Sequence, residues 1–226
     1  IKLGFDRARA RDLNWLFTNR KIPPRPIRHV QDQYLEFLEY LDIPYAPLEW
    51  NIGPWAAERA WQSQWISQFE RPVAAVVIAT SKPEKDWIPE RWAAVCDSLY
   101  SDYGLQPVLV GGRSPRELDA ERIIMQQASA PIRSELGSGL RKLISILDAS
   151  ALVLAPDTGP LHMSVALNRP IISLLGYTNH KRTGPYRRFH DLMIDAYADD
   201  GRDYVATMEN RPGRMPRITV DDVLNR

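Results

Sequence analysis

The spacing of hydrophobic positions in this chain changes near residue 70. Before that point, apolar residues recur every three to four positions over 30–41 and 54–69, which predicts two amphipathic helices. Beyond it, short apolar runs alternate with segments of helical spacing. The runs predict strands at 73–79, 107–112, 151–156, 170–176 and 190–194, and the other segments predict helices at 89–103, 114–128, 140–150, 160–167 and 219–226.

Near-continuous apolar strands separated by helices are typical of a parallel sheet that is covered on both faces. We therefore expect residues 71–226 to form an α/β domain with a Rossmann-like, doubly wound parallel sheet. Residues 1–70 are richer in Arg, Pro and Trp, and the aromatic stripe within 54–69 indicates a helix that packs on a domain. The chain begins with Ile1 and Lys2, and we expect it to be a fragment that enters in mid-domain.

Composition narrows the class of protein. With 44% hydrophobic and 25% charged residues, the 226-residue chain has enough apolar side chains for a sizeable core. A formal net charge of +1 gives no general attraction to nucleic acid, so we expect no nucleic-acid partner. The single cysteine, Cys96, excludes an internal disulfide and reads as a core thiol. The sequence shows no signal peptide and no apolar stretch of the ~20 residues that span a membrane, so a cytoplasmic location is expected.

The segment after the strand at 151–156 carries the clearest candidate chemistry. Ligands of open α/β sheets bind beyond the carboxyl ends of the strands, and here Asp157, Thr158 and Gly159 stand at such an end, before a helix that contains His162. A helix N-terminus beside a glycine is suited to bind an anion, and Asp157 is suited to accept hydrogen bonds from sugar hydroxyls. The residues allow a second interpretation equally well, in which Asp157 or Thr158 simply caps the helix.

Three further loops are weaker candidates. After the strand at 73–79, Thr80 and Ser81 offer hydroxyl groups and Lys85 a positive charge for a phosphate, although a solvated polar loop explains them as well. Gly137 belongs to a Gly-Ser-Gly turn that either approaches a ligand or only reverses the chain. The basic loop 180–188, which includes Arg182, suits an anionic ligand. The pair Gly111-Gly112 does not make a dinucleotide fingerprint.

Taken together, these loops resemble glycosyltransferase family 9, the bacterial heptosyltransferases of lipopolysaccharide core synthesis. The family pattern D-[ST]-G-x-x-H, then an apolar helix, a strand that begins with proline, G-x-T and R-x-G-P, is matched in order and spacing over about fifty residues. The matching residues are Asp157-Thr158-Gly159-Pro160-Leu161-His162, Ala166-Leu167, Pro170, Gly176-Tyr177-Thr178 and Arg182-Thr183-Gly184-Pro185. The loop "TSKPEKDWIPERW" and the stretch "GFDRARARDLNWLF" are similar to other segments of the family.

The resemblance implies a GT-B fold, in which two Rossmann-like domains face each other across a cleft. Residues 71–226 would be the C-terminal, nucleotide-sugar-binding domain, and residues 1–70 the end of the acceptor domain with interdomain linker and helices. It implies an inverting transfer of heptose from ADP-heptose to the inner core of a lipopolysaccharide precursor at the inner-membrane surface, with no cofactor and no bound metal. Thr80, Ser81, Lys85, Asp157, Thr158, Gly159 and His162 would bind the donor, and Gly137 and Arg182 would contact donor or acceptor.

The resemblance names no catalytic base in this chain. The family's catalytic aspartate lies in the part of the N-terminal domain that the sequence does not include, and Asp6 and Asp12 match no catalytic motif. Three other interpretations remain open: a glycosyltransferase that uses a UDP- or GDP-sugar, a non-catalytic nucleotide-sugar-binding module, and a purely structural α/β domain. The sequence says nothing of the oligomeric state.

Overall fold

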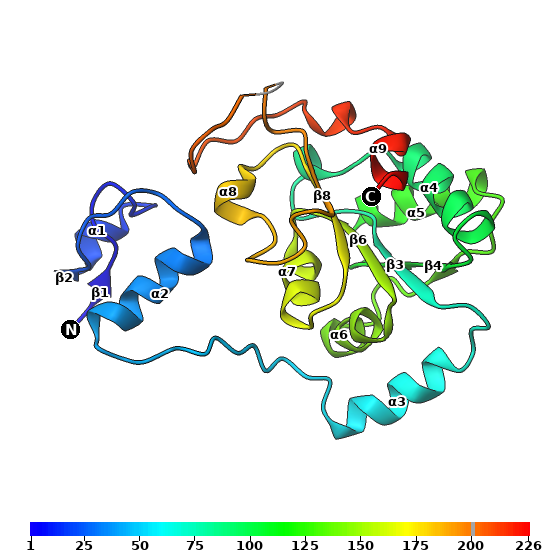
Figure 1. Cartoon of the computed structure of the whole chain (residues 1–226), viewed down its shortest axis with the longest axis horizontal. Helices are drawn as coiled ribbons and strands as arrows, with labels where there is room; N and C mark the ends of the chain where they lie inside the picture. Colours follow the sequence, from blue (N-terminus) through cyan, green and yellow to red (C-terminus); the bar gives the residue numbers. More distant parts are fainter. Residues whose placement is uncertain (200–201) are drawn as a thin grey trace.

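The computed structural model of the chain describes residues 1–199 and 202–226, which form a parallel-sheet unit and a smaller N-terminal unit (Figure 1). The six strands of the sheet run in the order β5-β4-β3-β6-β7-β8, and every neighbouring pair is parallel. Their bounds are Val73–Val77 for β3, Gln106–Val110 for β4, Arg133–Ser134 for β5, Leu152–Pro156 for β6, Ile171–Leu175 for β7 and Met193–Asp195 for β8.

The strand order reverses between β3 and β6. From β3 the chain continues outward through β4 to β5, then returns to the other side of β3 and continues outward through β6 and β7 to β8. Such a switch point leaves a crevice at the carboxyl ends of its two central strands, because the connections depart to opposite sides. The doubly wound parallel sheet predicted from the sequence is confirmed, and its topology places a ligand crevice beyond β3 and β6.

Alternate residues of the strands bury themselves under helices on the two faces. On one face, Val76 of β3 and Leu154 of β6 pack with α4, α5 and α9. On the other, Val77 and Val153 pack with α3, α6 and α7. The helices span Ala56–Ile66 (α3), Pro89–Ser101 (α4), Pro115–Gln127 (α5), Leu140–Ala149 (α6), Gly159–Ala166 (α7) and Val220–Leu224 (α9).

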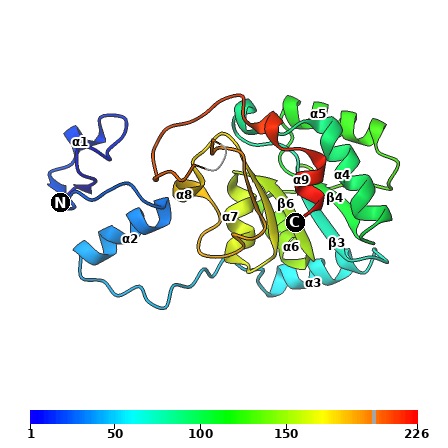
Figure 2. The ribbon, with the colours of Figure 1, turned by 45° about the horizontal axis from the view of Figure 1, so that its top comes forward.

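The N-terminal unit lies to one side of the sheet, next to α8 (His180–Thr183), in both ribbon views (Figures 1 and 2). It comprises the parallel pair β1 (Leu3–Gly4) and β2 (Arg20–Lys21), α1 (Asn14–Phe17) and α2 (Val30–Tyr40). An extended segment then leads to α3, which packs on α6 of the sheet unit. The division of the chain into domains at residues 70 and 71 stays a prediction.

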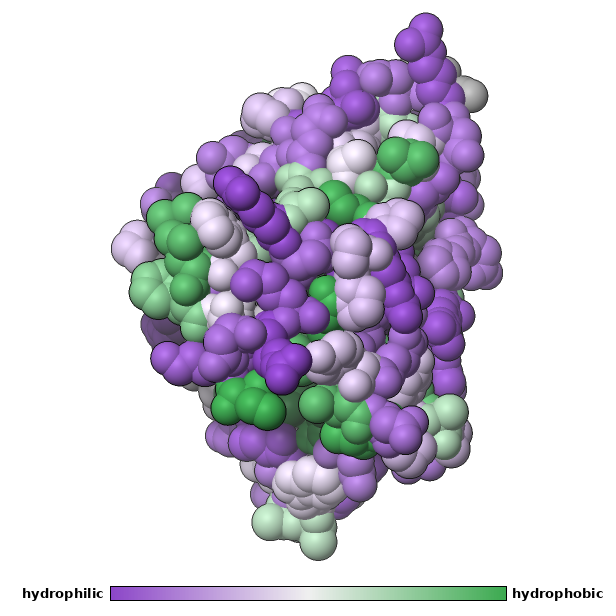
Figure 3. Space-filling model, turned by 90° about the vertical axis from the view of Figure 1, so that its left-hand side faces the viewer, coloured by the Kyte–Doolittle hydropathy of each residue, from purple (hydrophilic) through white to green (hydrophobic). Residues whose placement is uncertain are grey.

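A buried ion cluster holds the N-terminal unit together. The guanidinium of Arg9 donates to Asp6 at 2.5 Å, to Glu36 of α2 at 2.6 Å and to the carbonyl of Pro23 at 2.9 Å. Asp6 is therefore a structural partner of Arg9. Figure 3 faces this side of the molecule and shows separate hydrophobic patches within a mainly hydrophilic surface. The exposed apolar side chains of the unit include Leu13 and Phe17.

The predicted helices and strands are confirmed to within a few residues at each end. The sequence patterns missed the short elements β1, β2, α1, β5 and α8, as well as two single 3₁₀ turns, η1 (Pro83–Lys85) and η2 (Met215–Arg217). Cys96 is completely buried in α4, where burial raises the pKa of its thiol to about 12, so the prediction of a core thiol is confirmed.

Candidate functional site

A cavity of about 610 Å³ opens at the switch point of the sheet. Its wall comes from the segments that follow four strands: Thr80 and Ser81 after β3, Gly111 and Gly112 after β4, Gly137 after β5, and Thr158 with Pro160 after β6. Val77 forms part of the wall, and α5 and α6 complete it with Arg116, Glu117, Leu140 and Leu143. This volume lies within the range of pockets that hold small ligands.

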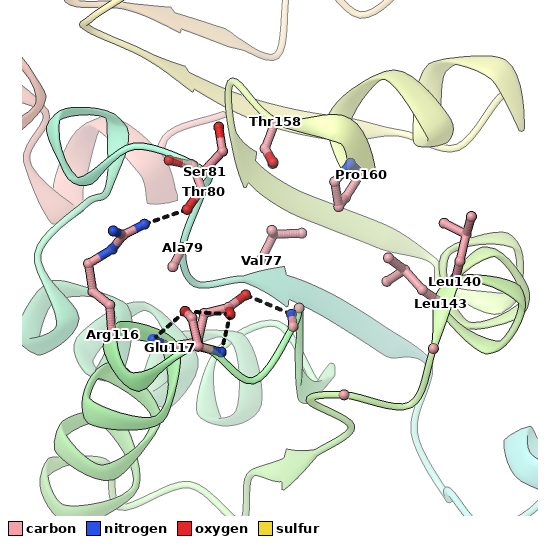
Figure 4. Close-up of a pocket in the computed structure, with 15 residues that line it drawn as sticks. Val77, Ala79, Thr80, Ser81, Arg116, Glu117, Leu140, Leu143, Thr158 and Pro160 are labelled. Carbon is pink, nitrogen blue, oxygen red and sulfur yellow. Dashed lines mark hydrogen bonds between the residues drawn. The ribbon is translucent and has the colours of Figure 1, made fainter.

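The cavity is polar at one end and apolar at the other (Figure 4). The side chains of Thr80, Ser81 and Thr158 lie together at one end, and Leu140 and Leu143 lie at the opposite end. Hydroxyl donors at a helix N-terminus suit an anionic group, whereas leucine side chains suit a flat apolar ring. The cavity is therefore suited to an elongated ligand with one charged and one aromatic part.

The loop after β3 is fixed by hydrogen bonds. The carboxylate of Asp86 accepts from the backbone N–H of Thr80 at 2.7 Å and from Arg116 at 2.6 Å, and Arg116 also donates to the carbonyl of Thr80 at 2.5 Å. The 3₁₀ turn η1 then directs Lys85 back toward the sheet, where only 16% of its side chain is exposed. Lys85 is therefore held against the sheet, whereas residues 81–84 of the same loop are exposed to solvent.

Asp157 joins the loop after β3 to the loop after β7. Its carboxylate accepts from Lys85 Nζ at 2.8 Å and from the Thr178 hydroxyl at 2.5 Å, and the Thr183 hydroxyl lies at 3.4 Å. His162 Nε2 lies 3.6 Å from the other carboxylate oxygen. Burial alone would raise the pKa of Asp157, but the contacts with His162, Lys85 and Thr178 outweigh it and lower the pKa well below its usual range. Asp157 is thus held ionised although only 7% of the residue is exposed.

The N-terminus of α7 has no side-chain cap. Thr158 occupies the cap position with an extended backbone, but its hydroxyl makes no capping hydrogen bond, and the carboxylate of Asp157 is engaged with Lys85 and Thr178 instead. The capping interpretation of this sequence is therefore wrong. In the first turn of α7, Pro160 has no N–H and Leu161 donates its N–H to the Thr158 carbonyl at 3.1 Å. The N–H of Gly159 and the positive end of the helix dipole are left for another partner, beside the polar end of the cavity that Thr158 and Pro160 line.

Glycines bring backbone close to the cavity on its other side. Gly137 has a φ of +72°, and a Cβ there would stand 2.3 Å from the Arg113 side chain, so only glycine fits this turn. Gly112 donates its N–H to Glu117 at 2.6 Å, and Ser114 donates to the same carboxylate at 2.8 Å. These contacts lower the pKa of Glu117 against the opposing effect of burial.

The predicted site residues fall into three places. Thr80, Ser81, Gly137 and Thr158 line the cavity directly. Lys85 and Asp157 form the buried pair beside it. The remaining three lie on its far side: Gly159 and His162 line a second cavity of about 350 Å³ between α7 and α2, and Arg182 lines a third next to the N-terminal unit.

Sequence reasoning missed the contribution of α5 and α6. Arg116, Glu117, Leu140 and Leu143 line the cavity but were assigned no role. One signal was available for Glu117, because Ser114 and Glu117 have the spacing of a capping box, and the structure shows both of its hydrogen bonds. Leu140 and Leu143 carried no signal, since their spacing is that of any buried helix face.

The described part of the chain offers neither a metal-binding cluster nor a membrane-spanning helix. Residues 1–199 and 202–226 contain no group of three or more His, Cys, Asp or Glu side chains arranged to hold a metal ion. Within the same residues, every helix is too short or too polar to cross a membrane.

Comparison with known proteins identifies relatives over most of the chain. The family model described as glycosyltransferase family 9 (heptosyltransferase) matches residues 1–200. The chain is 30% identical over 203 residues to the lipopolysaccharide core heptosyltransferase OpsX of Haemophilus influenzae, which covers 89% of this chain and 58% of that protein. It is 28% identical over 187 residues to lipopolysaccharide heptosyltransferase 1 of Escherichia coli K12, or 82% of this chain and 57% of that protein. The chain thus spans less than two thirds of these relatives.

Solved structures share the fold. The glycosyl transferase family 9 protein of Veillonella parvula superposes with a TM-score of 0.75 at 23% identity, over 94% of this chain and 63% of that one. The E. coli heptosyltransferase WaaC with ADP superposes with a TM-score of 0.66 at 22% identity, over 99% of this chain and 63% of that one. These likenesses confirm that the chain shares the fold of GT-B glycosyltransferases over nearly all of its length. That it holds the C-terminal half with a remnant of the N-terminal domain stays a prediction.

Proposed function

This chain belongs to glycosyltransferase family 9, and from that premise we propose that the cavity at the switch point binds the nucleoside diphosphate of a nucleotide-sugar donor. The observation that carries the proposal is the uncapped N-terminus of α7, which opens on the same polar end as the hydroxyls of Thr80, Ser81 and Thr158. A diphosphate at this end would accept from N–H groups that have no side-chain cap.

Lys85 would add a hydrogen-bond donor to the diphosphate site. An ammonium group has three N–H donors, and Lys85 uses two of them, on the Asp157 carboxylate at 2.8 Å and the Asp157 carbonyl at 3.3 Å. The third is left for a phosphate oxygen. Asp157 would position Lys85 and, through its contact with His162, the first turn of α7, while its lowered pKa keeps it ionised.

The opposite end of the cavity would hold the base and ribose. Leu140 and Leu143 offer an apolar wall, and the turn at Gly137 brings backbone close enough to contact a flat ring. Adenine is the base we propose, because one family structure that shares the fold was solved with ADP. Uracil and guanine are the alternatives.

In the whole protein, we propose an inverting transfer of heptose from ADP-heptose to a lipopolysaccharide precursor. A base outside this chain would deprotonate the acceptor hydroxyl, which attacks the anomeric carbon as the bond to the departing ADP breaks. Lys85 and the N-terminus of α7 would stabilise the negative charge that develops on the leaving diphosphate, so that this chain's own groups neutralise it. The acceptor would be met at the cytoplasmic surface of the inner membrane.

Calorimetric titration of the chain with ADP, UDP and GDP tests the proposal. We expect ADP to bind with one-to-one stoichiometry and more tightly than UDP or GDP. Thr158→Val keeps the shape of the side chain but removes a donor to a charged group, which should weaken ADP about tenfold. Ser101→Ala, which removes an exposed hydroxyl on α4, is the matched control and should have no effect.

Two other results of the titration would change the proposed ligand or contradict the proposal. Preference for UDP or GDP, still sensitive to Thr158→Val, would assign another nucleotide-sugar to the same site. Absence of binding by all three nucleotides would contradict the proposal.

A further inference from the structure

A small cavity separates the N-terminal unit from α8 of the sheet unit. It has a volume of about 150 Å³, several times the ~30 Å³ that one water occupies in the liquid, which is room for a phosphate or carboxylate group. Arg9 and Arg11 line it from the N-terminal unit, Tyr34 from α2, and Arg182 from α8. None of its lining residues within the described part of the chain is acidic.

Arg182 lines this cavity, and one nitrogen of its guanidinium has no hydrogen-bond partner in the described residues. Its Nε is inaccessible to solvent and has no acceptor among residues 1–199 and 202–226. A buried N–H group that donates to nothing costs free energy, because it has lost water without gaining a protein acceptor. The Nε–H of Arg182 is therefore a donor for which residues 1–199 and 202–226 supply no acceptor.

Arg11 faces the same space with only a weak partner. Its Nε donates to the sulfur of Met208 at 3.2 Å, and thioether sulfur is a poor acceptor for a guanidinium. Arg9 differs, because Asp6 and Glu36 neutralise it. The cavity thus combines one neutralised arginine with two that have no carboxylate partner in the described structure.

The guanidinium groups of Arg11 and Arg182 repel each other electrostatically. Burial first, and then the charge of Arg11, lower the pKa of Arg182, although Tyr34 and Asp157 partly oppose this. Two like charges on one cavity repel each other, and an anion placed between them would offset that repulsion with two attractions. Arginine is suited to this role because its planar fork binds carboxylate and phosphate with two hydrogen bonds.

The cavity lies next to the second cavity, which borders α7. It shares Val30 and Tyr34 with the second cavity, which in turn shares Gly159 and His162 with the loop at the N-terminus of α7. A molecule bound along α2 would therefore extend from Arg11 and Arg182 to the side of α7 opposite the nucleotide cavity.

We propose that Arg11 and Arg182 form an oxyanion subsite, which takes a carboxylate or phosphate group of the acceptor from both sides of the interdomain boundary. The subsite rests on the proposed function for the identity of its ligand as the acceptor, but its anion chemistry can be tested separately. An anion held between the two arginines would also join the N-terminal unit to α8 when the acceptor is bound.

Titration of the 226-residue chain with inorganic phosphate, in the presence of saturating ADP, tests the subsite by calorimetry. We expect one phosphate to bind, and Arg182→Gln and Arg11→Gln each to weaken it about tenfold or more through loss of a charge-assisted bond. Arg20→Gln, which removes an exposed arginine of β2, is the matched control for net charge and should leave the affinity unchanged. Repeating the titration with acetate distinguishes a carboxylate subsite from one selective for phosphate.

The outcomes separate this proposal from the previous one. If ADP binds but phosphate binds equally to wild type, Arg182→Gln and Arg11→Gln, the subsite is wrong and the donor site stands. If ADP fails to bind while phosphate still depends on both arginines, the donor site is wrong and the subsite stands. Phosphate binding that is lost in Thr158→Val and retained in Arg182→Gln would place the anion in the nucleotide cavity and overturn the subsite. Arg11 is exposed, so Arg11→Gln remains a valid test even if Arg182→Gln impairs folding.

Discussion

Replacing Asp157 by asparagine should reveal how strongly the Lys85 pair holds the two loops together. The ion pair is short, at 2.8 Å, and its side chains are only 16% and 8% exposed. Removing one partner of a buried pair costs about 3–5 kcal/mol, because the other charge is left without compensation. Lys85 keeps some access to water and asparagine can still accept from Thr178, so we expect the lower limit, about 3 kcal/mol. For a chain of this size that lowers Tm by about 6–12 °C.

A double-mutant cycle isolates the pair from the rest of the site. Urea unfolding of wild type, Asp157→Asn, Lys85→Met and the double variant should give a coupling energy of about 1–3 kcal/mol. Glu39→Gln provides the matched control, because it breaks an exposed pair with Arg25 whose side chains are 43% and 34% accessible. That substitution should cost less than about 1 kcal/mol.

The dependence on pH has a definite sign. The pKa of Asp157 is lower in the folded chain than its ordinary value of 3.8. Its ionised form therefore stabilises the fold fully at pH values well above 3.8. The stability gained relative to Asp157→Asn should be constant between about pH 5 and pH 7 and should shrink as pH falls below about 4. A coupling energy near zero, or a difference between wild type and Asp157→Asn that stays constant down to pH ~3, would refute this account of Asp157.

Three further predictions concern the body of the fold. Cys96 is buried and the pKa of its thiol is raised to about 12, so it should not react with a thiol reagent at pH ~8 in the folded chain. In urea it should react fully. Rapid labelling of the native chain would contradict its burial. Thr219→Ala removes the cap of α9 and should cost about 1 kcal/mol, measured as a drop in Tm of about 2–4 °C, whereas an unchanged Tm would show that the cap contributes nothing. Trp65 is 2% exposed, so Trp65→Ala should lower the free energy of unfolding in urea by about 3–5 kcal/mol. Trp55 is 48% exposed, so Trp55→Ala should lower it by under ~1 kcal/mol. Equal losses would mean that α3 does not pack as described.

Hydrophobic spacing predicted the sheet well because its strands are buried on both faces. Val73–Val77 and Ile171–Leu175 are completely buried runs, which the sequence shows directly. β5 escaped notice because it has only two residues, Arg133 and Ser134, and lies at the edge of the sheet with both half-buried. Its position is set by pairing with β4, and no local pattern encodes that contact.

The candidate site was predictable where its residues follow strands and hidden where distant segments meet. The sequence indicated Thr80, Ser81 and Thr158 because each follows closely on an apolar run that predicts a buried strand. The sequence could not show that Asp157 binds Lys85 and Thr178, since those partners are 72 and 21 positions away. It likewise left the capping and binding interpretations of Thr158 balanced, until the structure showed its hydroxyl making no cap.

The most direct test of the central claim is a crystal structure of this chain grown with ADP. We predict that ADP occupies the cavity at the switch point, with its diphosphate against Thr80, Ser81 and Thr158 at the N-terminus of α7, and with adenine between Gly137 and Leu140. In that structure Lys85 should contact a phosphate oxygen while it keeps its bond to Asp157. ADP bound elsewhere, or in this cavity with adenine at the N-terminus of α7, would contradict the account.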